Sequence, residues 1–189
     1  MTRLQLAIDY AARMHEGQIR KLSHVPYILH PMEAAAVAAS LTDDEDVIIA
    51  ALLHDVLEDT DATEEEVERL FGKRVLALVK SETENKRKDQ PASVTWKIRK
   101  QESLDELAKA NRDEKIVWLS DKLSNMRALS KDYVLIGNRV FEAFNERRKA
   151  QHEWYYRSIL DLLESELGDT FAYLEYKQLV YLVFKGEPQ

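Results

Sequence analysis

The chain contains no cysteine, so it forms neither disulfide bonds nor zinc sites built from thiolates. No apolar run approaches the roughly 18 residues that a membrane-spanning helix needs. The N-terminal segment MTRLQLAIDYAARMHEGQ is too polar for a secretory signal. Glycine and proline are scarce, with five and four residues, and no segment is typical of a long linker. These absences predict a cytoplasmic protein without a membrane partner.

Basic residues are fewer than acidic ones, with 27 lysines and arginines against 34 aspartates and glutamates. The formal net charge of −7 argues against a general nucleic-acid partner, although a local basic patch can still hold an anionic small molecule. The composition, 45% hydrophobic and 32% charged, is ordinary for a globular protein, and 189 residues are enough to bury one core. We therefore expect a single domain over residues 1–189. Whether the chain forms a homo-oligomer is left open.

Apolar residues recur at helical spacing along most of the chain, without hairpin-turn dipeptides or alternating strand patterns. Thr2, Thr63 and Thr95 are candidate N-caps, and Pro31 is a candidate for the first position of its helix. Asp43 or Asp44 is expected to cap a helix that continues through HDVLEDT. Later helices are expected over 64–71, 73–82, 96–110, 115–129, 137–167 and 170–185. The chain is therefore predicted to be an all-α bundle.

A cluster of ionisable residues follows a buried segment. His54, Asp55, Glu58 and Asp59 come directly after the seven uninterrupted apolar residues 47–53. Residues three and four apart share a helix face, so all four side chains are expected to point from one helix end toward a single point. Three carboxylates this close repel one another unless protons or a cation intervene. A divalent metal accounts for the cluster most economically.

A metal site needs ligands beyond this cluster. Asp121 interrupts the apolar helix IVWLSDKL, where an unpaired carboxylate is costly, and His30 stands at a predicted helix start. Each residue alone has an ordinary explanation, because histidines beside prolines often act as caps or pack in the core. An aspartate within a helix usually faces solvent. The remaining histidines are His15, His24 and His152, of which the last is expected to be an ordinary helix residue.

In combination these residues reproduce a known pattern. His30, then His54-Asp55, then Asp121 follow the H…HD…D order of the HD-domain phosphohydrolases. The segments RKLSHVPYILHP, AALLHDVLEDT, FGKRVLALV and LSDKLSNMRAL resemble successive motifs of the (p)ppGpp hydrolase domain of the RelA/SpoT family. They also resemble its small stand-alone, SpoT-like members, over roughly residues 1–130. The resemblance implies an HD-domain helical bundle that hydrolyses the 3′-pyrophosphate of guanosine (p)ppGpp to GDP or GTP and pyrophosphate.

The same resemblance assigns roles to residues of the acidic cluster. Glu58 and Asp59 match the acidic pair that activates or orients the attacking water, and their place one turn beyond the ligands suits that role. The cofactor that the resemblance implies is a divalent metal, typically Mn²⁺, and two imidazoles with two carboxylates suit such an ion. Its implied ligands are His30, His54, Asp55 and Asp121.

Substrate contacts are predicted in two places. Arg20 and Lys21 match the basic pair that flanks the nucleotide base in the family, and Asn125 matches a residue that contacts the nucleoside. Lys97 and Lys100 lie three apart, share a helix face, and are candidates for binding a terminal phosphate. For all four cations an ordinary solvated surface is the alternative.

The sequence departs from the family pattern at several points. His24 stands where the family usually has glycine, Ser120 replaces an alanine, and the segments 81–100 and 137–189 differ from the long RelA/SpoT enzymes. Two other functions therefore stay open. One is hydrolysis of another nucleotide, such as a 5′-nucleotide or NADPH. The other is a non-catalytic nucleotide-binding module, against which the intact Glu58-Asp59 pair speaks.

Overall fold

The computed structural model describes residues 1–87 and 89–184, and its regular secondary structure there is helical, apart from an isolated bridge between Ile19 and Pro26. The prediction of an all-α fold is confirmed. No helix in the described ranges is both long and apolar enough to cross a membrane. The elements are α1 (Arg3–Met14), α2 (Leu29–Ala39), α3 (Glu45–Leu53), α4 (Val56–Asp59), α5 (Glu64–Phe71), α6 (Lys73–Glu82), α7 (Ala92–Leu107), α8 (Arg112–Ile136), the 3₁₀ helix η1 (Gly137–Ala143), α9 (Lys149–Leu167) and α10 (Phe171–Phe184).

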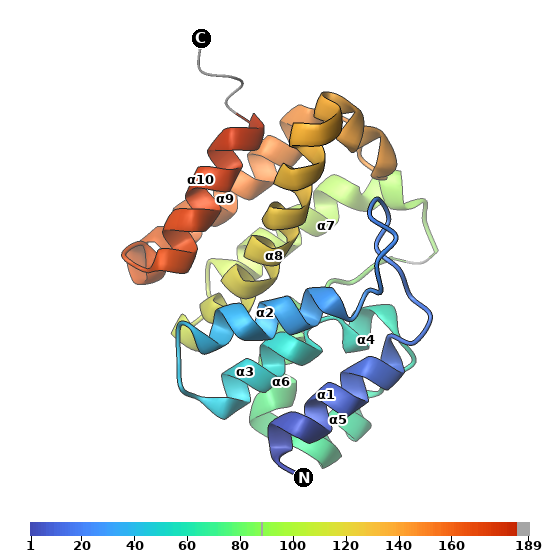
Figure 1. Cartoon of the computed structure of the whole chain (residues 1–189), viewed down its shortest axis with the longest axis vertical. Helices are drawn as coiled ribbons and strands as arrows, with labels where there is room; N and C mark the ends of the chain where they lie inside the picture. The colour runs from blue at the N-terminus through green and yellow to red at the C-terminus, as the bar shows by residue number, and fades with distance from the viewer. Residues whose placement is uncertain (88, 185–189) are drawn as a thin grey trace.

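The long helix α8 forms the centre of the molecule, with α2, α3 and α10 packed against it (Figure 1). Its residues 115–121 are all buried, and most of them are apolar. Helix α3 is also largely buried, because it carries the apolar run 47–53. Polar side chains in the middle of α8 and at the end of α3 are therefore held inside the protein by the packing around them.

Side-chain caps fix several helix starts at the predicted residues. Thr2 and Gln5 form a capping box at the start of α1. The side chain of Asp44 caps α3 and that of Thr63 caps α5. Each such cap stabilises a helix by about 1 kcal/mol, because it pairs backbone N–H groups that the helix itself leaves without acceptors.

Among the predicted helix starts, those of α2 and α7 are wrong by a few residues. Helix α2 begins at Leu29, so Pro31 is its third residue instead of its first. It still lies in the first turn, where a missing N–H costs no helical hydrogen bond. Helix α7 begins after Pro91, so Thr95 lies within the helix and does not cap it. There its hydroxyl accepts a hydrogen bond from Arg99 Nε at 3.2 Å.

The predicted helix through HDVLEDT consists of two helices. Helix α3 ends at Leu53 and the four-residue α4 begins at Val56, with His54 and Asp55 in the turn between them. The ring nitrogen Nδ1 of His54 lies 2.8 Å from the carbonyl oxygen of Ala51. In a continuous helix that carbonyl would accept from the backbone N–H of Asp55. The histidine side chain therefore competes with the helical hydrogen bond at the point where the helix breaks.

The prediction of one long helix over 137–167 is also wrong. Gly137 ends α8 with a φ of +60°, and η1 follows before α9 starts at Lys149. Between them the carboxylate of Glu146 accepts hydrogen bonds from the backbone and side chain of Arg148. Amphipathic spacing does not reveal such a local interruption. The predicted end of the last helix at Lys185 lies outside the described residues.

His24 occupies a backbone conformation that favours glycine. Its φ is +55°, and its N–H donates to the carbonyl of Arg20 at 3.1 Å within the loop that the Ile19–Pro26 bridge closes. The left-handed region costs a residue with a Cβ roughly 1–2 kcal/mol. The loop thus keeps these hydrogen bonds with histidine, instead of the family's usual glycine, at position 24.

Replacing His24 with glycine is expected to raise the free energy of unfolding by about 1 kcal/mol, because the strain disappears and the exposed side chain makes no buried contact. Urea denaturation measures the change, with an unaltered m-value. His24→Ala keeps the Cβ and is the matched control, expected to give no stabilisation. A less stable glycine variant would contradict the strain argument.

Candidate metal centre and substrate cavity

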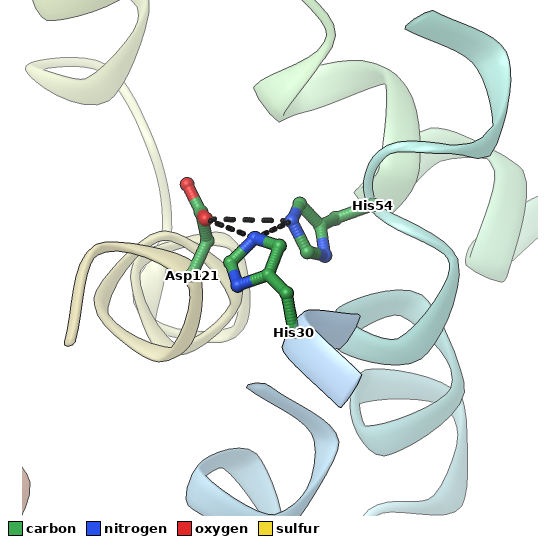
Figure 2. Close-up of side chains that lie close together, drawn as sticks. All are labelled: His30, His54 and Asp121. Atoms are coloured by element: carbon green, nitrogen blue, oxygen red, sulfur yellow. Dashed lines mark hydrogen bonds and ion pairs between the residues drawn. The ribbon is translucent and has the colours of Figure 1, made fainter. Parts of the chain in front are cut away.

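Three helices bring two histidines and an aspartate to one point (Figure 2). His30 lies in the first turn of α2, His54 follows α3, and Asp121 lies in α8. The Nε2 atoms of the two histidines are 3.2 Å apart. Asp121 Oδ1 lies 3.0 Å from Nε2 of His30 and 3.4 Å from Nε2 of His54. Three of the four predicted metal ligands therefore converge in the buried interior.

The surroundings of His54 place its ring proton on Nδ1 and leave Nε2 as the acceptor. The Nδ1 atom of His54 faces the Ala51 carbonyl, which only accepts, so this nitrogen carries the ring proton. The Nδ1 atom of His30 lies 2.8 Å from Ser124 Oγ. When both rings carry their proton on Nδ1, their Nε2 lone pairs are open to a cation beside the carboxylate of Asp121. This nitrogen and oxygen donor set fits a divalent metal ion.

Asp55, the fourth predicted ligand, lies beside the same group. Its Oδ2 is 3.0 Å from Nε2 of His54 and 3.5 Å from Nε2 of His30. The hydroxyl of Tyr27 donates to this oxygen at 2.6 Å. Burial would raise the pKa of Asp55, but the two histidines hold that pKa well below its usual value. Asp55 is therefore available as a carboxylate.

The carboxylates also act on His54. Burial would lower the pKa of His54, but Asp55 and Asp121 together raise that pKa well above its usual value. The carboxylates thus stabilise positive charge at the ring. The charged form of the ring carries a second proton, on Nε2. A divalent cation would take the place of this second proton, because both need the same Nε2 lone pair.

A buried ion pair that sequence reasoning missed lies behind Asp121. Lys122 Nζ contacts Asp121 Oδ2 and lies 3.0 Å from Glu82 Oε1. Burial would lower the pKa of Lys122, but Asp121 raises it well above its usual value. Burial raises the pKa of Glu82, although Lys122 opposes the shift. The carboxylate of Asp121, which looked costly in an apolar helix, is therefore balanced in part by its own neighbour.

The predicted acid pair occupies the short helix α4. Glu58 Oε2 accepts a hydrogen bond from the backbone N–H of Glu84 at 3.0 Å. Lys86 Nζ lies 3.3 Å from Glu58 Oε1 and also pairs with Asp59 Oδ1. Burial, and then the charge of Asp55, raises the pKa of Glu58. A raised carboxyl pKa suits a group that exchanges protons during catalysis.

A cavity of about 790 Å³ adjoins the four predicted metal ligands, which are called the metal-ligand group from here on. His30 and Asp59 line it together with the predicted substrate contacts Arg20, Lys21 and Asn125. Arg20 Nη2 donates to Asn125 Oδ1 at 3.2 Å, which ties the loop after α1 to α8. The structure therefore brings these three predicted contacts into one cavity beside the predicted metal ligands.

The described part of this wall does not include Lys97 or Lys100. Lys97 lies over the ring of Trp154, with its Nζ 5.3 Å from the ring centre. Lys100 lies 4.9 Å from the ring centre of Tyr155 and 3.3 Å from Glu84 Oε1. The two lysines thus reach aromatic side chains of α9. Their predicted role in phosphate binding has no support from the cavity lining.

Sequence reasoning missed several residues of the cavity wall, among them Glu33, Arg127 and Tyr156. Glu33 lies three residues after the predicted ligand His30, so helical spacing from that ligand would have found it. Tyr156 belongs to α9, and the residue spacing around it gives no signal of the cavity.

The remaining histidines lie outside the metal-ligand group. His15 is buried, with its Nδ1 2.9 Å from Gln18 Oε1, and His24 is exposed. His152 is buried among aromatic rings and its Nε2 bonds the carbonyl of Glu146 at 2.7 Å. Burial lowers the pKa of His152. His152 is therefore packed in the core, in line with its expected structural role.

Several known proteins are similar to this chain over the segments that carry the site. A family model described as HD domain matches residues 7–148. The guanosine-3′,5′-bis(diphosphate) 3′-pyrophosphohydrolase MESH1 of Drosophila melanogaster is 41% identical over 126 residues, which cover 65% of this chain and 66% of that protein. The GTP pyrophosphokinase of Myxococcus xanthus is 38% identical over 129 residues, 67% of this chain but only 17% of that protein. The chain thus spans less than two thirds of either relative's length.

Solved structures show the same fold over most of the chain. One, described as a metazoan ortholog of SpoT that hydrolyzes ppGpp, has a TM-score of 0.75 at 28% identity and covers 95% of this chain and 94% of its own. A crystal structure from Listeria monocytogenes has a TM-score of 0.72 at 30% identity, over 83% of this chain and 99% of its own. The resemblance to the RelA/SpoT hydrolase domain is thereby confirmed.

Proposed function

The chain belongs to the HD-domain family, and from that membership we propose that it is a metal-dependent phosphohydrolase acting on guanosine (p)ppGpp. The proposed reaction removes the 3′-pyrophosphate with water and yields GDP or GTP and pyrophosphate. This is the reaction for which the Drosophila relative is named. Mn²⁺ as the metal and the cytoplasm as the location complete the proposal.

One observation supports this function most strongly. The Nε2 atoms of two histidines and the carboxylates of Asp55 and Asp121 converge next to a cavity that also carries Arg20 and Asn125. A nucleotide phosphohydrolase needs a cation for the phosphates and polar groups for the nucleoside. The cavity volume of about 790 Å³ lies within the range of roughly 300–1,000 Å³ that ligand pockets occupy. Residues suited to each requirement therefore lie side by side, which supports the proposal.

The residues around this point divide the chemistry between them. A divalent ion held by the four predicted ligands would supply positive charge to a phosphate oxygen and lower the pKa of a water molecule. Asp59, which lines the cavity, would accept a proton from the attacking water, together with its neighbour Glu58. Water oxygen bonds to the phosphorus as the bond from phosphorus to the ribose 3′-oxygen breaks. The acid pair then returns a proton to that 3′-oxygen.

A turnover screen tests the proposed substrate. Purified protein with Mn²⁺ is offered ppGpp, NADPH, nucleoside monophosphates and deoxynucleoside triphosphates, and the products are separated by chromatography. We expect GDP and pyrophosphate from ppGpp with the highest kcat/KM. A higher kcat/KM for NADPH or a 5′-nucleotide would replace the substrate and keep the metal chemistry. Binding without turnover of any compound would favour a nucleotide-binding module.

Arg20→Ala is expected to raise KM for ppGpp by roughly ten- to a hundredfold, the effect of losing one hydrogen bond to a charged group. The guanidinium lines the cavity, so its loss weakens binding more than turnover. Arg69→Ala is the matched control, because it makes the same chemical change at an exposed residue of α5 that does not line the cavity. Steady-state kinetics measure both variants. Equal increases in KM would contradict the assignment of Arg20.

A further inference from the structure

A chain of hydrogen bonds leads from the metal-ligand group to the C-terminal helix. His30 Nδ1 lies 2.8 Å from Ser124 Oγ, and Ser124 Oγ donates to Glu33 Oε2 at 2.6 Å. Glu33 Oε1 accepts from Arg127 Nη1 at 3.0 Å. Arg127 in turn donates from Nε and Nη2 to the two carboxylate oxygens of Glu175, each at 2.7 Å. Four side chains thus connect His30 to α10.

The carboxylate of Glu33 sets the direction of the first two hydrogen bonds. A carboxylate only accepts, and a serine hydroxyl has one proton to give. Because Ser124 gives its proton to Glu33, the serine oxygen accepts from the Nδ1–H of His30. The Nε2 atom of His30 then carries a lone pair, and this is the atom that lies 3.2 Å from His54 Nε2.

We propose that Ser124 and Glu33 are positioning residues for the metal centre: they hold the ring proton of His30 on Nδ1 and keep Nε2 free as a ligand. The inference rests on the proposed ligand role of His30. His54 needs no such side chains, because the Ala51 carbonyl holds its proton. Substitution of residues that hydrogen-bond a metal ligand typically lowers metal affinity 10- to 100-fold.

Arg127 and Glu175 hold the outer end of this series of hydrogen bonds in place. The Glu33 side chain is 39% exposed on the cavity wall, so it needs a partner to stay directed at Ser124. The two-point contact between Arg127 and Glu175 fixes the guanidinium against Glu33. Helix α10, whose described residues contribute nothing to the cavity wall, is in this way linked to the metal centre.

The test is the Mn²⁺ affinity of the metal-free protein, measured by isothermal titration calorimetry, with the melting temperature as a check on folding. Ser124→Ala is expected to weaken Mn²⁺ binding 10- to 100-fold while the protein stays folded. Ser124→Thr keeps the hydroxyl and is expected to bind like the wild type. Ser130→Ala is the matched control, because it removes another buried α8 hydroxyl, which bonds the backbone carbonyl of Arg127.

A second series tests whether Glu33 acts through the serine. Glu33→Ala should also weaken Mn²⁺ binding, and the double variant with Ser124→Ala should lose no more than Ser124→Ala alone. Additive losses would overturn the proposal, because Glu33 would then act independently of Ser124.

His30→Ala distinguishes this inference from the proposed ligand set. If His30→Ala loses Mn²⁺ binding while Ser124→Ala binds like the wild type, the positioning role is overturned and the ligand set stands. Wild-type affinity in His30→Ala would overturn both.

Discussion

Asp121→Asn is expected to lose most of the bound Mn²⁺ and, with it, the hydrolytic activity. The carboxylate is buried and lies 3.0 and 3.4 Å from the Nε2 atoms of His30 and His54. Asparagine keeps the size of the side chain but removes the charge that attracts a cation. The loss of metal affinity should exceed the 10- to 100-fold that residues behind a ligand produce. Metal content after dialysis and ppGpp turnover, measured on the same preparation, give the result.

Asp113→Asn is the matched control for this experiment. It makes the same chemical change on the same helix, at a residue whose side chain is 41% exposed and pairs with Arg74. Its metal content and turnover should equal those of the wild type. Full metal content in Asp121→Asn would remove this residue from the ligand set.

Glu58→Gln and Asp59→Asn are each expected to lower kcat by roughly 10²–10⁴, the scale of general acid–base groups. Both changes preserve size but remove the basicity needed to handle the proton of the attacking water. The four predicted metal ligands stay in place, so Mn²⁺ content and KM should change much less. Steady-state kinetics on metal-loaded protein separate the two effects.

If Glu58 and Asp59 have only a structural role, a different result is expected. Glu58 accepts from the backbone of Glu84, and both acids contact Lys86, so their loss can loosen the segment after α6. In that case the melting temperature should fall while kcat stays within a few-fold of the wild type. Glu65→Gln, an exposed change in the first turn of α5, is the control. A wild-type kcat in the doubly substituted, metal-loaded protein would contradict the catalytic role.

The helices were predictable because the apolar spacing that defines them is also what the core requires. The run 47–53 fills a buried helix, and the residues around Asp121 do the same in α8. The polar residues inside these segments stood out because burial without a partner is costly. That contrast singled out Asp121 and the cluster after residue 53 as candidate metal ligands, and the family resemblance added His30.

The details that sequence could not supply depend on contacts between distant segments. At the break after α3 the side chain of His54 bonds the carbonyl of Ala51, while the backbone angles of His54 and Asp55 remain helical. Ser124 and Glu33 are 91 residues apart in the chain, so no spacing rule connects them. Lys97 and Lys100 do share a face, but only the position of α9 shows that this face meets aromatic rings.

The most direct measurement of the central claim is a crystal structure of the protein with Mn²⁺, using anomalous scattering to locate the metal. We expect one strong peak within about 2.0–2.3 Å of Nε2 of His30 and His54 and of carboxylate oxygens of Asp55 and Asp121, the usual range for such ligands. A fully occupied peak bound elsewhere, with these four side chains uncoordinated, would contradict the account.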